Sequence, residues 1–168
     1  LLAERLFAPL KRIGPFRPAL GGAIVGLLGV AFVIGFGWIM QTPKPVRFDT
    51  YPMPAFFGDG YGVIRTMLDG TFGSMIDAKT AIALVMTILV LKIVATSVTL
   101  GSGGSGGVIA PSLFLGAASG ELLGSMLPII GGTQGRAPMF AIIGMGACLA
   151  AVVHAPLASI LILFELTL

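Results

Sequence analysis

Long apolar runs without a charged side chain restrict the possible folds of this chain more than any other feature of its sequence. Ala19 to Met40 form a run of 22 residues that contains no charge, and a bilayer core of about 30 Å needs roughly 20 apolar residues as a helix. Residues 93–120 contain no charged side chain either, and Ala137 to Phe164 carry no formal charge. Because backbone polar groups in lipid must be satisfied within the segment, such runs predict helices that enter or cross a membrane.

The composition excludes several other classes of protein. Hydrophobic residues make up 56% of the chain and charged residues 10%, with a mean hydropathy of +1.03. So few charges cannot cover the surface of a soluble domain, and a disordered chain needs many more of them. The net charge of +3 is too sparse for a nucleic-acid-binding face. The single cysteine, Cys148, excludes an intramolecular disulfide and a cysteine metal cluster, and we expect neither a metal nor a cofactor.

Glycine and proline divide the apolar sequence into segments of unequal length. Short hydrophobic segments interrupted by these residues are typical of the discontinuous helices of channels and transporters. The pattern therefore predicts an all-α membrane protein with broken and re-entrant helices. The expected helices cover residues 18–40, 61–69, 79–100, 108–127, 137–154 and 156–168. Residues 41–59, rich in proline and aromatic residues, are expected to form a loop.

One cation, Lys92, interrupts the expected helix 79–100. We expect its side chain to snorkel or to pack near a helix end, and the alternative is a direct role in binding an ion. The chain has no initiator methionine and an apolar run reaches Leu168. We therefore expect it to be a piece of a longer protein.

A tract of seven glycine and serine residues, 101–107, lies between two apolar segments. Glycine adopts positive φ at little cost and lets the backbone approach a ligand closely. A helix that begins near Gly107 points free N–H groups, from Val108 onward, at this tract, and such a helix end attracts anions. Pro111 fits the first turn, where it removes no hydrogen bond. The absence of a carboxylate in the tract favours a small anion over a hard cation, which needs oxygen ligands.

Three other interpretations of the tract remain open at this point. Its composition resembles that of a flexible linker, but the segments on either side are apolar enough to enter a membrane, which argues against a linker. Residues 103–106 also match the G-x-S-G form of an intramembrane serine protease, with Ser105 as nucleophile and His154 as base. A glycine-rich tract produces such a match easily, so we do not expect an enzyme. The third interpretation is a structural membrane scaffold without an ion site.

Three motifs resemble those of the chloride channel and chloride/proton antiporter (CLC) family. Residues 107–111, GVIAP, are similar to the family's G-x-F-x-P anion-site motif, and the family also places a Ser/Gly run before that motif. Residues 144–157, GMGACLAAVVHAPL, together with FELT at 164–167, are similar to its G-M-G-A…A-P-L…E-M-T stretch. The resemblance extends over nearly the whole chain and is best from Val94 to Thr167.

The resemblance implies transmembrane chloride transport, by a channel or a chloride/proton antiporter. It places the chain in the C-terminal half of an inverted-repeat transmembrane domain. The backbone N–H groups of Val108 and Ile109 would bind chloride, and Ile109 replaces the family's usual phenylalanine. The residues expected to shape the site are Gly104, Gly106, Gly107, Ala110 and Pro111.

The resemblance also implies partners and a location. Expected partners are chloride, protons in the case of an antiporter, the lipid bilayer, and a second copy of the protein in a homodimer formed through helix 156–168 and helices outside the chain. The location would be a membrane crossed several times, the inner membrane in a bacterium. Glu165 matches a family position, for which we expect a structural role. The family's serine motif, gating glutamate and pore tyrosine do not occur in this sequence, so channel and antiporter both stay open.

Overall fold

The computed structural model describes residues 16–39, 55–70, 78–129 and 137–167, and all regular secondary structure in these ranges is helical. The helices are α2 (Arg17–Ile39), α3 (Tyr61–Leu68), α5 (Ala78–Gly101), α6 (Ile109–Met126), α7 (Ala137–Val153) and α8 (Pro156–Thr167). Their ends lie within one residue of the ranges expected from the sequence. The expected ends at residues 40 and 168 lie outside the described residues.

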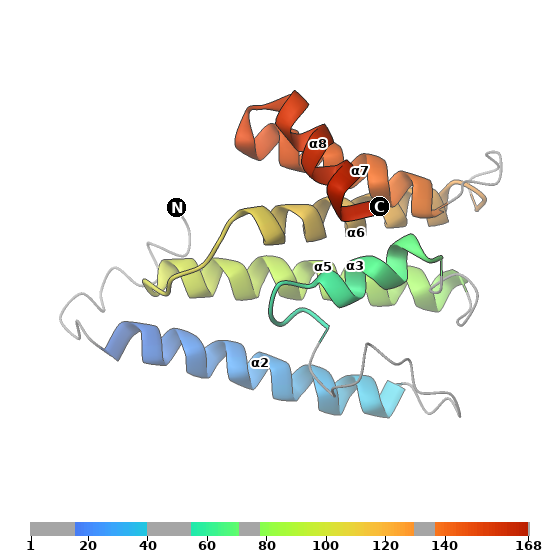
Figure 1. Cartoon of the computed structure of the whole chain (residues 1–168). Helices are drawn as coiled ribbons and strands as arrows, with labels where there is room; N and C mark the ends of the chain where they lie inside the picture. The colour runs from blue at the N-terminus through green and yellow to red at the C-terminus, as the bar shows by residue number, and fades with distance from the viewer. Residues whose placement is uncertain (1–15, 40–54, 71–77, 130–136, 168) are drawn as a thin grey trace.

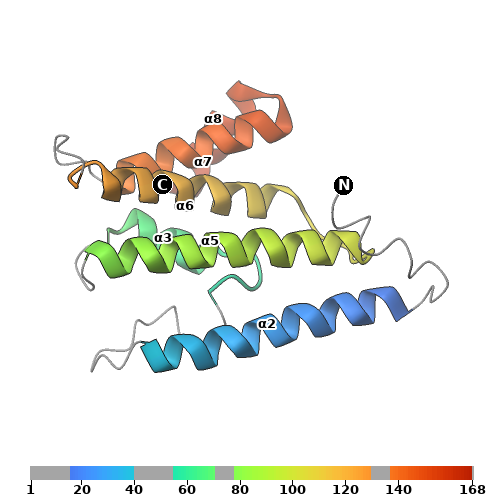
Figure 2. The same ribbon diagram turned by 180° about the vertical axis from the view of Figure 1, so that it is seen from behind.

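The long helices are stacked side by side, and both views show the same order (Figures 1 and 2). α2 packs along α5, α5 packs against α6, and α7 covers α6 from the other side. α8 folds back onto α7, and the short α3 contacts both α6 and α7. Because α3, α5 and α7 all pack against it, α6 is the central helix of the described chain.

Two described segments, Arg17–Gly35 and Lys79–Gly101, are long and apolar enough to cross a membrane. The first of them presents large apolar side chains outward, among them Leu27 at 71% and Ile34 at 61% exposure. Apolar surface of this extent is unusual on a soluble monomer and fits a helix that faces lipid or other membrane helices.

α6 and α7 meet at their backbones because small residues line their contact. A methyl group added at Gly116 would overlap the carbonyl of Gly144, and one added at Gly120 would overlap the carbonyl of Phe140. Small residues four positions apart allow this approach, and the resulting van der Waals contact is a main source of helix association in membranes. The contact packs α6, the helix that follows the Gly/Ser tract, tightly against α7.

A second packed region holds residues 55–60 beside α5 and α6. Phe56 and Phe114 are buried at 1% and 0% exposure, and the ring of Phe56 meets that of Phe57 edge-on at 4.9 Å between centroids. Gly60 has φ of 81° and lies against the ring of Phe114. A side chain at position 60 would therefore meet both a strained backbone and this ring. Glycine at position 60 therefore lets this segment pack against α6.

The break between α7 and α8 follows from Pro156. Proline has no N–H group and is favoured at the first position of a helix, and α8 begins at this residue. His154, two residues before Pro156, is exposed and has φ of 57°. The long apolar run 137–164 therefore forms two short helices in place of one span.

Candidate functional site

The helix α6 begins without a side-chain cap. Val108 is its N-cap residue, and the carbonyl of Val108 accepts hydrogen bonds from the Ser112 N–H at 3.1 Å and the Ser112 hydroxyl at 2.6 Å. Pro111 lies in the first turn, as expected from the sequence. Within the described residues, the N–H groups of Val108, Ile109 and Ala110 have no hydrogen-bond partner. These donors, together with the positive end of the helix dipole, remain available to a ligand.

The Gly/Ser tract turns the chain from the end of α5 into this helix start. The Gly104 N–H donates to the carbonyl of Thr99 at 2.9 Å, and Gly103 has φ of 88°, which favours glycine. These residues close the C-terminal end of α5. Gly104, which the sequence assigned to the site, therefore belongs to this turn.

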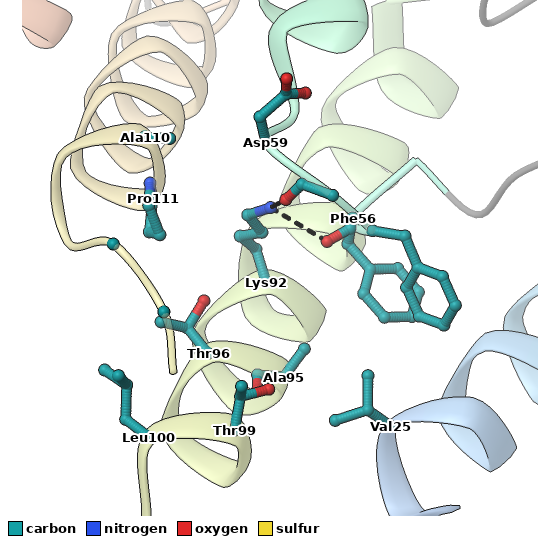
Figure 3. A pocket seen from close by; sticks show the side chains of 14 residues that line it. Val25, Phe56, Asp59, Lys92, Ala95, Thr96, Thr99, Leu100, Ala110 and Pro111 are labelled. Carbon is teal, nitrogen blue, oxygen red and sulfur yellow. Dashed lines mark hydrogen bonds between the residues drawn. The ribbon is translucent and has the colours of Figure 1, made fainter. Parts of the chain in front are cut away.

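A pocket of about 490 Å³ lies beside the helix start, between α2, α5, α6 and residues 55–60 (Figure 3). Four of the residues expected to shape the site line it: Gly106, Gly107, Ala110 and Pro111. The side chains of Val108 and Ile109 are not part of its lining and are 52% and 50% exposed. The structure thus gathers most of the predicted residues at one place, with the two expected donor residues at its edge.

Lys92 supplies a buried positive charge in the pocket wall. Its side chain is 3% exposed, and Nζ donates to the carbonyls of Phe56 at 3.1 Å and Gly58 at 2.8 Å (Figure 3). The ammonium also lies 5.2 Å from the ring centroid of Phe114. The expected snorkelling is therefore wrong, because residues 55–60 bring carbonyl acceptors to the middle of α5. Asp59, an exposed residue, lines the same pocket.

Two threonines of α5 line the pocket and differ in their hydrogen bonding. The hydroxyl of Thr99 donates to the carbonyl of Ala95 at 2.8 Å, whereas the hydroxyl of Thr96 has no partner among the described residues. In Figure 3 the Thr96 hydroxyl points into the space between Lys92 and Pro111. Sequence reasoning did not find Thr96, and no local pattern marks it. For Lys92 the available signal was its position as a lone cation in an apolar run.

The residues of the protease interpretation do not form a catalytic pair. Ser105 is exposed in the tract, and His154 is exposed between α7 and α8. In the described part of the chain no hydrogen bond joins them, although nucleophile and base must lie within hydrogen-bond reach. Among the same residues no group of three or more histidine, cysteine, aspartate or glutamate side chains could hold a metal ion.

Comparisons with known proteins give a consistent result. A family model described as "Voltage gated chloride channel" matches residues 1–168. A ClcB-like protein of Ralstonia nicotianae is 37% identical over 169 residues, which cover 99% of this chain and 32% of the relative. The voltage-gated ClC-type chloride channel ClcB of Citrobacter koseri is 32% identical over 162 residues, which cover 96% of this chain and 32% of that protein. No solved structure matches the chain.

The chain therefore spans about a third of the length of these curated relatives (32%). The matched family is one of membrane channels and not of enzymes, so the protease interpretation has no support from sequence comparison or geometry. The match of the family model over all 168 residues shows that the chain belongs to the CLC family of voltage-gated chloride channels.

Proposed function

We propose that the chain forms part of a transmembrane chloride path, in which the backbone N–H groups of Val108 and Ile109 bind the anion. The observation that carries this proposal is the uncapped start of α6. Its first N–H groups have no partner among the described residues, and helix N-termini with free donors are natural anion sites. Ile109 contributes a main-chain donor, which does not depend on its side chain, so its difference from the usual phenylalanine leaves the donor in place.

The adjoining pocket adds donors to those of the helix start. Lys92 places its amino group in the wall, and the Thr96 hydroxyl offers a further donor. The two bonds from Lys92 go to neutral carbonyls, so the ammonium charge is not cancelled by a directly bonded carboxylate. Asp59 lines the same pocket and partly offsets the charge of Lys92, so the free N–H groups at the start of α6 and the Thr96 hydroxyl supply the main attraction for an anion. A site built mainly from dipoles attracts an anion and also releases it, as transport requires.

We also propose a wider assembly for the full-length protein. The chain would form one half of an inverted repeat, with broken and re-entrant helices, and two copies would pair through α8. Leu157, Leu161 and Phe164 are 80%, 70% and 62% exposed, and their spacing places them on one face of α8. Such an apolar row fits a helix covered by a partner subunit. Glu165, exposed on the same helix, would have a structural role there.

Two experiments test the site and the function separately. Crystals of the full-length protein that carries this chain, soaked in bromide, should show anomalous density within hydrogen-bond distance of the Val108 and Ile109 nitrogens. Bromide bound elsewhere, with none at the start of α6, would refute the site.

The second experiment measures chloride efflux from liposomes that contain the full-length protein. We expect efflux above that of protein-free liposomes. Correctly folded protein that passes no chloride at any pH or voltage would refute the function and would favour a structural scaffold.

A further inference from the structure

Glu121, in the middle of α6, is a buried acid that the proposed chloride site does not use. Its side chain is 2% exposed, and its Oε2 atom is buried and has no hydrogen-bond partner among the described residues. An ionised carboxylate without a partner is very costly in an apolar interior, whereas the neutral acid costs far less. The location therefore favours the protonated side chain.

The helices packed against α6 bring no compensating charge to Glu121. α7 has no charged residue, and its one titratable group is the Cys148 thiol. α3 carries Tyr61 and Arg65, both exposed, and Lys79 of α5 is exposed as well. Among the described residues, none of these groups makes an ion pair or hydrogen bond with Glu121.

The remaining cation on α5, Lys92, serves a different part of α6. Its ammonium lies against the Phe114 ring and is held by the carbonyls of residues 56 and 58. Phe114 and Glu121 are seven residues apart, which is about 10 Å along a helix. Lys92 is therefore committed to the pocket and does not neutralise the acid.

The surroundings of Glu121 also resist rearrangement. A methyl group added to Gly120 would overlap the Phe140 carbonyl, and one added to Gly124 would overlap Ala137. The two glycines that flank the acid in the contact with α7 thus lie directly on that helix. Because this packing hinders a rotation of α6 that would expose Glu121 to water, the side chain stays in the helix contact when its charge changes.

We propose that Glu121 is a proton-binding site, whose carboxylate takes up one proton to become a neutral carboxylic acid, and that its ionisation weakens anion binding at the start of α6. The second part rests on the proposed chloride site. Ile109 and Glu121 are twelve residues apart, about 18 Å along the helix. Coulomb's law at an effective dielectric constant of about 20 converts this separation into a change of about fivefold in chloride affinity. The sign is fixed: higher pH removes the proton, adds negative charge and lowers the affinity.

Protonation of Glu121 is tested by infrared difference spectroscopy of the full-length protein at a series of pH values. Wild-type protein should show a protonated-carboxyl band at neutral pH that disappears only on alkalinisation. Glu121→Gln should abolish this band, Glu121→Asp should shift it, and Asp69→Asn, which alters an exposed acid at the end of α3, should leave it unchanged. A wild-type protein without such a band at neutral pH overturns the proposal, whether or not the variants fold. So does a band that survives in Glu121→Gln.

The coupling is tested by chloride efflux at several chloride concentrations, at neutral and alkaline pH. Between neutral and alkaline pH, the apparent chloride affinity of the wild-type protein and of Asp69→Asn should fall about fivefold more than that of Glu121→Gln. Equal pH dependence in wild type and Glu121→Gln overturns the coupling. If the wild type passes no chloride, the proposed function fails, while the infrared band still decides whether Glu121 binds the proton.

Discussion

Replacing Gly120 with alanine should force α6 and α7 apart. The added methyl group would overlap the carbonyl of Phe140, and this obstacle is helix backbone, which cannot move aside as a flexible side chain can. Overpacking of a tight contact costs about 1–3 kcal/mol, and the rigid obstacle places this case near the upper value. Alanine recovers about 1 kcal/mol of helix propensity over glycine. We therefore expect a net loss of about 2 kcal/mol in the free energy of unfolding.

The chain offers a matched control in Gly26→Ala on α2, where a methyl group would meet no atom within 4 Å. That variant should be neutral or stabilised by up to about 1 kcal/mol through helix propensity. The assay is denaturant or thermal unfolding of the two full-length variants in detergent, followed by the helical circular dichroism signal. The chloride affinity measured by efflux should fall in Gly120→Ala alone, because α6 carries the proposed donors. Equal unfolding midpoints for the two variants would show that the α6–α7 contact is not as tight as the structure indicates.

Three further outcomes follow from the pocket and from α8. Lys92→Met should lower the free energy of unfolding by about 2 kcal/mol, because two charge-assisted hydrogen bonds are lost and only part of that loss is recovered by not burying a charge. Its chloride affinity should fall too, and Lys92→Arg should keep more of the wild-type affinity than Lys92→Met does. Thr96→Val should weaken chloride binding by about 1 kcal/mol, whereas Thr99→Val, whose hydroxyl already donates to a carbonyl, should leave the affinity unchanged; equal effects in the two would contradict the assigned donor. Leu161→Arg together with Phe164→Arg should convert the full-length dimer to monomers in light scattering, and an unchanged mass would exclude α8 from the interface.

Most of the helical architecture could be predicted from local sequence. Long apolar runs set the positions of α2 and α5, and Pro156 divides the last run into α7 and α8. These predictions succeed because helix limits depend on residues that lie within a few positions of each other. The free donors at Val108 and Ile109 have the same origin, since the first N–H groups of any helix lack partners within it.

Other features depend on residues that are distant in the chain. Lys92 binds carbonyls 34 and 36 residues earlier, so no local pattern shows that it stays buried. The pocket combines residues of α2, α5, α6 and the 55–60 segment, and the difference between Thr96 and Thr99 appears only once these elements meet.

Glu121 illustrates the division between local pattern and tertiary packing. Its position in an apolar helix is visible in the sequence, but whether it has a partner in the described part of the chain depends on which residues α3, α5 and α7 place around it. Short-range patterning determines where the backbone is helical and where its donors are free. Burial, by contrast, depends on the approach of whole helices, which here is made possible by glycines that meet across the α6–α7 contact.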